Sequence, residues 1–312
     1  MFIDEKRIHN QPITLSFLKD SSIELYVKRE DQLHPMVSGN KFRKLKYSLL
    51  EAEQQDHTTL LSFGGAYSNH IAATAAAGKQ LGFKTIGVIR GDELAKDLEN
   101  TFSTNATLRE ARNNGMQFYF VDRETYRTKE DPQFLNELKK RYGNFYLIPE
   151  GGTSMLAVKG CEEILTNEDK KFDYICVAVG TGGTIAGLIN TVAAHQQVIG
   201  FPALKGSFLK EEILKLTSKT TNWCLQTAYH FGGYAKSDPI LIAFMNQFLK
   251  ETGIQLDPIY TGKMFYGLVQ MIQNQELKTG SKVLLIHTGG LQGIEGYNKI
   301  LAKKQQEIIQ VL

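Results

Sequence analysis

The sequence contains few cysteines and no long apolar run. Three cysteines occur among 312 residues, at positions 161, 176 and 224, and no two of them form a C-x-x-C pair. This odd, widely spaced set is typical neither of a disulfide-rich domain nor of a zinc site, so no metal is expected. Cys176 lies within an apolar run and is expected in the core. No apolar stretch approaches the roughly 20 residues that span a membrane, and residues 1–7 lack the apolar block of a secretory signal. These absences predict a cytoplasmic protein with no membrane partner.

The chain also lacks a strong excess of charge. Its 36 basic and 33 acidic residues give a formal net charge of +3. No stripe of lysine and arginine with interleaved aromatic residues occurs, and the short basic runs at 139–141 and 303–304 are typical of solvated helix faces. The composition therefore gives no reason to expect a nucleic-acid partner.

Several common catalytic motifs are missing. The chain has no P-loop (G-x-x-x-x-G-K-[ST]), no G-x-S-x-G elbow and no H-E-x-x-H pair. Residues 180–185 carry the first two glycines of a dinucleotide fingerprint but end in Ile185, and no acidic residue lies in 194–202 to hold a ribose. A nucleotide hydrolase, a serine hydrolase and a metallohydrolase are disfavoured, and a nicotinamide oxidoreductase remains only as an alternative.

What the chain does contain is a glycine-rich turn between an apolar run and a helix-like pattern. The run at 177–179 is followed by Gly180, Thr181, Gly182, Gly183 and Thr184. Such a turn lets backbone N–H groups converge on an anion, and the following helix start adds partial positive charge. No lysine stands inside the turn, which favours a phosphate that is held rather than transferred. Pyridoxal phosphate fits this pattern, because its phosphate only attaches it and its chemistry lies on the ring.

That cofactor needs a lysine, and Lys41 is the best placed. It lies in the turn 38–44, directly before a helical pattern formed by Leu45, Leu49 and Ala52. A lysine at such a helix start is held firmly, and neighbouring cationic groups help to lower its pKa.

Short strand-like runs alternate with helical patterns along the chain, which predicts an α/β fold with parallel sheets covered by helices. Helices are expected around 45–52, 71–81 and 241–249. Four glycine pairs follow apolar runs, at 64–65, 151–152, 182–183 and 289–290. Because ligands bind at the carboxyl ends of parallel strands, these pairs indicate one ligand surrounded by strand ends. The expected strands are 24–28, 59–63, 85–89, 117–121, 145–148, 174–179, 198–200 and 282–287.

Several motifs match one family in order over nearly the whole chain. They are Lys28–Asp31, Gly39–Leu45, Gly64–Gly65 with Ser68–His70, Pro149–Gly152, Gly180–Thr184, Asp257–Lys263 and His287–Gly290. On these motifs the chain resembles the 1-aminocyclopropane-1-carboxylate deaminase and D-cysteine desulfhydrase family, a branch of the tryptophan-synthase-β-like pyridoxal-phosphate enzymes.

The resemblance implies a two-domain α/β fold with parallel twisted sheets and the cofactor, pyridoxal 5'-phosphate, in the cleft between the domains. It places a large cofactor-binding domain in 1–44 and 150–312 and a small inserted domain in 45–149. Family members are commonly homodimers that act on a small amino acid.

The resemblance also implies roles for single residues. Lys41 forms the Schiff base, the amides of 180–184 hold the phosphate, and Asn69 lies against the ring. Ser68, Asn69 and His70 hold the substrate carboxylate, although Ser68 alone would also serve as a helix N-cap. Tyr260 and Tyr234 are expected near the reacting centre; a half-buried aromatic is the alternative for Tyr234.

Two threonines bear on the reaction. Cyclopropane deaminases of the family carry a glutamate after the tyrosine of Tyr-x-Gly-Lys and an apolar residue before the last glycine pair. This chain has Thr261 and Thr288 there, as in the desulfhydrase-like members. A carboxylate beside the ring nitrogen favours its protonated form, and a neutral hydroxyl does not. The threonines favour α,β-elimination from D-cysteine, giving a keto acid, ammonia and sulfide. The alternatives are cyclopropane ring opening, a racemase or dehydratase, and a pyridoxal-phosphate-binding protein without turnover.

Overall fold

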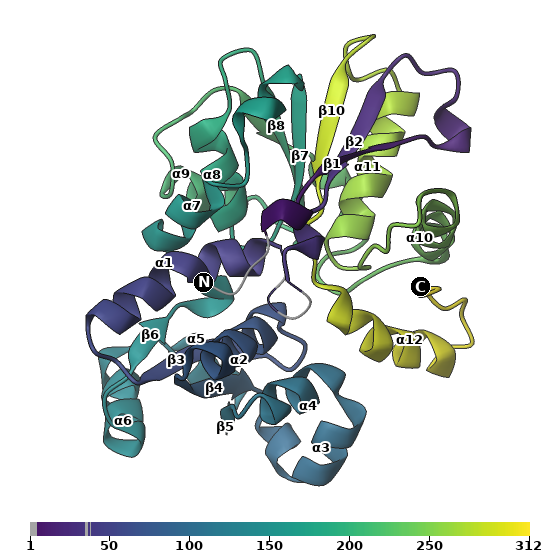
Figure 1. Cartoon of the computed structure of the whole chain (residues 1–312). Coiled ribbons are helices and arrows are strands. Elements are labelled where there is room, and N and C mark those ends of the chain that lie inside the picture. The colour runs from purple at the N-terminus through teal and green to yellow at the C-terminus, as the bar shows by residue number, and fades with distance from the viewer. Residues whose placement is uncertain (1–4, 35–36, 38) are drawn as a thin grey trace.

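The computed structural model describes residues 5–34, 37 and 39–312 and contains two β-sheets, each covered by helices (Figure 1). One sheet has six strands in the order β1-β2-β10-β7-β8-β9, and the other has four in the order β5-β4-β3-β6. Ser38, the first residue of the predicted turn, lies outside the described residues. The strands are β1 (Asn10–Ile13), β2 (Glu24–Lys28), β3 (Thr59–Gly65), β4 (Lys84–Arg90), β5 (Gln117–Val121), β6 (Tyr146–Ile148), β7 (Tyr174–Val179), β8 (Gln197–Pro202), β9 (Trp223–Leu225) and β10 (Lys282–Ile286).

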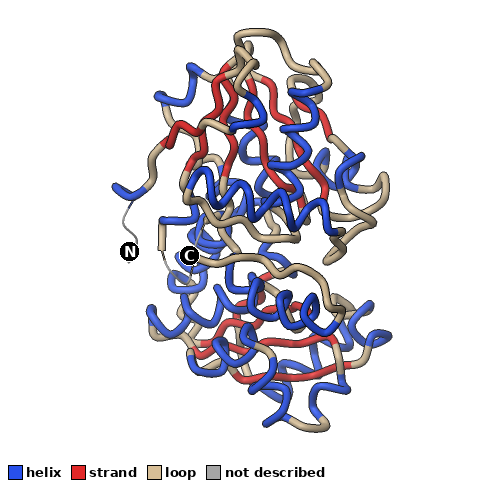
Figure 2. Tube along the Cα trace, turned by 90° about the vertical axis from the view of Figure 1, so that its right-hand side faces the viewer, coloured by secondary structure: helices blue, strands red, loops and turns tan. Residues whose placement is uncertain are grey.

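Helices connect most of these strands and lie on both faces of the sheets (Figure 2). Within the described residues, none of them has both the length and the apolarity needed to cross a membrane. They are α1 (Asn40–Gln54), α2 (Asn69–Leu81), α3 (Leu98–Thr104), α4 (Ala106–Asn113), α5 (Arg123–Arg127), α6 (Pro132–Tyr142), α7 (Met155–Cys161), α8 (Gly183–Thr191), α9 (Leu209–Leu214), α10 (Pro239–Thr252), α11 (Thr261–Gln273) and α12 (Ile294–Lys303), with short 3₁₀ turns at Glu5–Arg7, Ser16–Leu18, Glu30–Gln32, Asp92–Ala95, Glu150–Gly152, Asn167–Lys171, Thr227–Tyr229 and Leu291–Gly293.

The predicted parallel α/β architecture is confirmed. All neighbouring strands pair in parallel except β1, which runs antiparallel to β2 at one edge. All eight predicted strands are present, and β1 and β9 were not predicted. Both are short edge strands, and β1 contains Pro12, which has no N–H to donate and is typical of an edge position. The segment 208–225, which carries no sequence motif, forms α9 and β9.

The core divides along the two sheets. Helices α10, α11 and α12 pack on one face of the six-stranded sheet, and α7, α8 and α9 pack on the other. Helices α1 and α2 cover one face of the four-stranded sheet, and α5 and α6 cover the opposite face. Cys176 is fully buried in the first of these clusters, as predicted.

The chain segments that supply the two sheets are separate in sequence. The six-stranded sheet is built from 10–28 and 174–286, and the four-stranded sheet is built from 59–148. Helix α1 runs without a break across position 45, where the sequence predicts the start of the small domain. The exact division into domains stays a prediction.

Candidate active site

Lys41 lies in the first turn of α1, which begins against the end of β10. Gly39, directly before the helix, has a φ of +58°, and a Cβ at this position would lie 2.1 Å from the carbonyl oxygen of Thr288. Only glycine permits so close an approach. Lys41 Nζ donates to Asn40 Oδ1 at 3.0 Å, and Asn40 Nδ2 donates to Thr184 Oγ1 at 2.9 Å. The predicted lysine and the predicted glycine loop are therefore neighbours.

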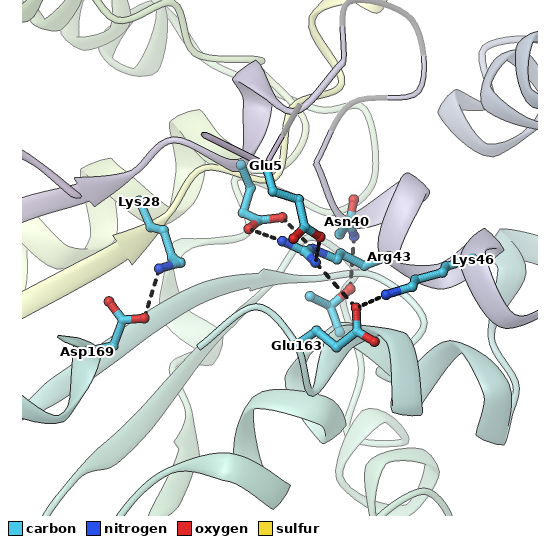
Figure 3. A network of polar contacts seen from close by, with 9 residues as sticks. Glu5, Lys28, Asn40, Arg43, Lys46, Glu163 and Asp169 are labelled. Atoms are coloured by element: carbon cyan, nitrogen blue, oxygen red, sulfur yellow. Dashed lines mark hydrogen bonds and ion pairs between the residues drawn. The ribbon is translucent and has the colours of Figure 1, made fainter. Parts of the chain in front are cut away.

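Arg43 holds the start of α1 through ion pairs, of which those with Glu5 and Glu163 are labelled in Figure 3. Arg43 Nε and Nη2 donate to the two carboxylate oxygens of Glu30 at 3.0 and 3.1 Å. The carbonyl oxygen of Glu30 also accepts from the N–H of Gly39 at 2.9 Å. Because a bidentate pair restrains both distance and orientation, this contact limits the movement of Lys41, two residues away.

The environment of Lys41 weakens its hold on a proton. Burial and, to a smaller extent, the neighbouring ammonium of Lys44 lower the pKa of Lys41 to about 7. The sequence predicted a cationic neighbour; the structure identifies it as Lys44 and makes burial the larger cause. A large fraction of Lys41 is then a neutral amine near pH 7, which is the form that attacks a carbonyl or accepts a proton.

Lys44 is a site residue that the sequence reasoning missed. Its Nζ donates to Gly151 O at 3.0 Å, to Thr153 Oγ1 at 3.0 Å and to Thr181 Oγ1 at 3.1 Å. Burial lowers the pKa of Lys44 to about 8. The glycine loop contains no lysine of its own, but α1 supplies one. The spacing could have indicated it, because positions i and i+3 of a helix share a face.

The glycine loop connects β7 to α8. Gly182 takes a φ of +89° at the N-cap position, so α8 begins directly at Gly183. The first N–H groups of a helix have no partner within it. Together with the ammonium of Lys44, these N–H groups form a site suited to a phosphate.

Ser68, Asn69 and His70 form the start of α2, and their side chains have different partners. Ser68 is the N-cap, its Oγ accepting from the N–H of Ile71 at 3.3 Å. Asn69 Nδ2 lies 3.5 Å from the carbonyl oxygen of Gly290, across the cleft. The start of α2 is thus placed against the loop that follows β10.

The His70 ring points to the four-stranded sheet. Its exposed fraction is 1 %, and its Nε2 lies 2.9 Å from Ser62 Oγ. Because the Ser62 hydroxyl donates to Ile148 O at 2.9 Å, Nε2 carries the ring proton and donates to Ser62. Nδ1 is buried without a hydrogen-bond partner, and burial, with Lys41 and Lys44, lowers the pKa of His70 to about 3. The ring is neutral, and the backbone N–H of His70 is the group free for an anion.

Tyr260 and Tyr234 lie together at the other side of the same cavity. Their ring centroids are 6.2 Å apart in an edge-to-face arrangement. A Cβ on Gly180 would lie 3.2 Å from Tyr260 Cε1, so the glycine loop leaves room for this ring. Burial raises the pKa of Tyr260 well above its ordinary value, with Tyr234 and Asp257 acting in the same direction. Tyr260 therefore keeps its phenolic proton at any ordinary pH.

The two threonines differ in position. Thr288 lines the cavity, whereas Thr261 is fully buried outside it. Thr261 Oγ1 donates to Asp257 Oδ1 at 2.8 Å and accepts from the N–H of Asp257 at 2.9 Å. Asp257 in turn accepts from the N–H groups of Ile259, Tyr260 and Thr261 at the start of α11. The Thr261 hydroxyl therefore makes both of its hydrogen bonds with Asp257.

One cavity collects these residues. Every residue predicted to act in catalysis or to bind cofactor or substrate lines it, except Gly183. The structure adds Asn40, Lys44, Gly151, Ala178, Val179, Ile185, Gly289 and Gly290. No aspartate or glutamate is among the described residues that line it. Across the described part of the chain, no cluster of three or more His, Cys, Asp or Glu is arranged to hold a metal ion. The individual roles of the lining residues stay predictions.

Comparisons with known proteins show which proteins this chain is similar to. The family model described as "Pyridoxal-phosphate dependent enzyme" matches residues 6–289. The chain is 32% identical over 308 residues to a putative 1-aminocyclopropane-1-carboxylate deaminase of Pyrococcus horikoshii, covering 91% of this chain and 90% of that protein. It is 31% identical over 301 residues to the mitochondrial bifunctional D-cysteine desulfhydrase/1-aminocyclopropane-1-carboxylate deaminase of Arabidopsis thaliana, covering 89% and 74%. The solved structure of an ACC deaminase homologue superposes with a TM-score of 0.80 at 29% identity, covering 95% and 93%.

The residues of the cavity fit pyridoxal phosphate. A lysine of lowered pKa lies at one side, as the cofactor aldehyde requires. The start of α8 and Lys44 supply N–H groups and positive charge for a phosphate. A Cβ on Gly183 would lie 3.3 Å from Lys44 Cε, so a side chain here would crowd the lysine that contacts the glycine loop. The start of α2 offers a second, separate set of N–H groups, which suits a substrate carboxylate.

Proposed function

The chain belongs to the 1-aminocyclopropane-1-carboxylate deaminase and D-cysteine desulfhydrase family of pyridoxal-phosphate dependent enzymes, and we propose that it catalyses α,β-elimination from D-cysteine. The overall change is D-cysteine plus water to pyruvate, ammonia and hydrogen sulfide. The bond that breaks is the β-carbon–sulfur bond, and its electron pair leaves with the sulfur.

The observation that carries this proposal is the lack of a carboxylate at the cavity. No acidic side chain is among its described lining residues, Thr288 presents a hydroxyl, and Thr261 is held by Asp257. Without a carboxylate, none of the described lining residues would favour the protonated form of the nitrogen in the pyridine ring of the cofactor. A moderate electron sink is sufficient to release a thiolate, whereas opening an unactivated cyclopropane demands a stronger one.

Bound pyridoxal phosphate supplies the electron sink that stabilises negative charge at the substrate α-carbon. Lys44 and the first N–H groups of α8 hold the phosphate. The N–H groups at the start of α2 bind the substrate carboxylate and orient the α-carbon. Lys41 Nζ, whose pKa is about 7, accepts the α-proton as a general base.

The two tyrosines are placed to act on the other end of the substrate. Tyr260 keeps its proton, because burial raises its pKa, and its ring lies beside the glycine loop. We assign Tyr260 Oη, with Tyr234 next to it, to hydrogen bonding or proton donation at the leaving sulfur. This role would keep the departing group neutral.

The test is a keto-acid and sulfide assay on the purified protein with D-cysteine, L-cysteine and 1-aminocyclopropane-1-carboxylate. We expect sulfide and pyruvate in equal amounts from D-cysteine and no keto acid from the cyclopropane. Lys41→Ala should abolish both products and change the absorbance of the bound cofactor. Turnover retained in Lys41→Ala would refute the site assignment.

Ring opening is the second candidate, because relatives of this chain carry the deaminase name. Keto acid from the cyclopropane, with no sulfide from D-cysteine, would establish it in place of our proposal. Loss of optical activity without keto acid would indicate a racemase. A coloured protein that leaves a panel of D- and L-amino acids unchanged would indicate a binding protein.

We also propose that the protein is a homodimer of the cytoplasm, with no nucleic-acid or membrane partner. The resemblance to dimeric family members and the low cysteine content support this. Light scattering coupled to size exclusion tests the dimer, and fractionation of the native cell tests the location.

A further inference from the structure

Lys263 is a buried lysine that the proposed reaction does not use. It lies in the first turn of α11 with an exposed fraction of 1 %. Its Nζ donates to His230 O at 2.9 Å and to Gly233 O at 2.8 Å. Among the described residues, Lys263 forms no ion pair; burial lowers its pKa to about 8, and the nearby Asp257 carboxylate acts in the opposite direction. Burying an ammonium costs free energy because the charge loses its hydration, and here two main-chain carbonyls take the place of water.

The segment that Lys263 binds has a strained backbone. Phe231 and Ala235 have φ values of +53° and +55°, and Gly232 and Gly233 also lie at positive φ. A non-glycine residue in this region costs on the order of 1–3 kcal/mol and persists only where its surroundings hold it. Backbone strain of this kind, next to a cavity, indicates that contacts with the rest of the protein hold the segment in its conformation.

The two carbonyls that Lys263 binds are those that close the turns of this segment. His230 O also accepts from the N–H of Gly233 at 3.0 Å, and Gly233 O accepts from the N–H of Lys236 at 3.2 Å. The Lys263 ammonium therefore ties together two consecutive turns, which span 230–236. Tyr234 lies within the second turn, one residue after the second bound carbonyl.

Tyr234 depends on this backbone for its position. The residue is 43% exposed, yet its ring lies edge-on to that of Tyr260, with the two ring centroids 6.2 Å apart. Tyr260 is the N-cap of α11, and Lys263 follows three residues later on the same face. One helix thus carries the first tyrosine and holds the segment that carries the second.

We propose that Lys263 is a positioning residue, whose ammonium clamps the 230–236 segment so that the Tyr234 hydroxyl stands beside Tyr260 at the reacting centre. The inference rests on the proposed function only in giving Tyr234 a part in turnover. The clamp itself is a property of the backbone and can be measured without any substrate.

The test compares the holoenzymes of wild type, Lys263→Met, Lys263→Gln, Tyr234→Phe and the double variant Lys263→Met/Tyr234→Phe. Lys236→Met is the matched control, because this exposed lysine lies in the same segment and its ammonium makes no hydrogen bond to a described residue. Hydrogen exchange of the amides of 231–236 should become at least tenfold faster in Lys263→Met and stay unchanged in the control. Lys263→Gln keeps two N–H donors on a shorter side chain and should fall between them.

Kinetics then separate positioning from general destabilisation. With whichever amino acid the protein turns over, kcat of Lys263→Met should fall by about 10- to 100-fold, which is the loss expected when a catalytic group is displaced by about 1 Å. The double variant should be no slower than Tyr234→Phe alone, because both changes remove the same contribution. A double variant slower by the product of the single effects would overturn the proposal, as would unchanged exchange in 231–236.

The two proposals fail in different ways. A protein inert toward every amino acid but with faster exchange in Lys263→Met would refute the proposed function and keep the clamp. Turnover of D-cysteine by the wild type, with unchanged hydrogen exchange in Lys263→Met, would support the proposed function and refute the clamp. If Lys263→Met does not fold, the exchange and kinetics of Lys263→Gln decide on the same criteria.

Discussion

Replacing Lys44 with methionine removes one charge from the centre of the site and little else. Methionine keeps most of the length of the buried stem, while the three hydrogen bonds from Nζ to Gly151, Thr153 and Thr181 are lost. Two consequences follow for the cofactor: its phosphate loses a cation, and Lys41 loses the charge that helps to lower its pKa.

The size of the first consequence can be worked out from the contact. A hydrogen bond to a charged group contributes about 1.5–3 kcal/mol, which corresponds to a 10- to 150-fold weaker affinity for pyridoxal phosphate. The second consequence has a defined direction. Burial remains the main cause of the lowered Lys41 pKa, so that pKa should rise on losing Lys44 but stay below its ordinary value.

The assay is titration of the apoprotein with pyridoxal phosphate at several pH values, followed by the cofactor absorbance. Binding to wild type should strengthen as pH rises through about 7, because only the neutral Lys41 amine reacts, and the midpoint should move upward in Lys44→Met. Lys46→Met is the matched control, since its ammonium pairs with Glu163 (Figure 3) and the residue does not line the cavity. An affinity for Lys44→Met within twofold of the control would refute the reasoning.

Three further changes test the site more briefly. The pKa of His70 is about 3 in the folded protein and 6.5 in the unfolded chain, so the free energy of unfolding decreases as pH falls below 6.5. By pH 5 the wild type should have lost ~2 kcal/mol more of this free energy than His70→Gln, measured by denaturant unfolding. Equal losses in the two proteins would contradict the prediction. Gly39→Ala should cost at least 1–3 kcal/mol from backbone strain alone, measured against Gly293→Ala, where a Cβ meets open space; equal midpoints would contradict the close approach. Thr261→Val should lose about 1–3 kcal/mol, because both of its hydrogen bonds with Asp257 disappear, while the cofactor absorbance stays constant; a changed absorbance at full stability would show that Thr261 reaches the ring.

The elements that the sequence predicted share a strong local signal. The strands at 24–28, 117–121 and 174–179 have the predicted bounds, because each is an apolar or β-branched run between polar turns. The glycine loop is equally local, since its conformation depends on glycines adjacent in the chain. Features of this kind need no knowledge of what packs against them.

The parts that were missed depend on partners far along the chain. Lys44 became a site residue only when the 151–153 and 181 segments met it, more than 100 residues away in sequence. Nothing in the sequence indicated that the His70 ring would hydrogen-bond to Ser62, whose hydroxyl in turn donates to Ile148 O. Edge strand β9 has only three residues, and its pairing with β8 decides its state. Single-sequence patterns contain no record of such contacts.

The strand order of the larger sheet determines when this protein can become an enzyme. Strand β10 lies between β2 and β7 and pairs with both. It therefore connects β1 and β2 to the rest of the sheet, although it follows β2 by more than 250 residues. The four-stranded sheet draws all of its strands from 59–148 and can close while the rest of the chain is still being synthesised. The β1–β2 hairpin must wait, unpaired on one side, until residues 282–286 have left the ribosome. Thr288 and Gly290, which complete the cavity, arrive with that same strand. A chain interrupted before β10 therefore lacks the part of the cavity wall that Thr288 and Gly290 supply.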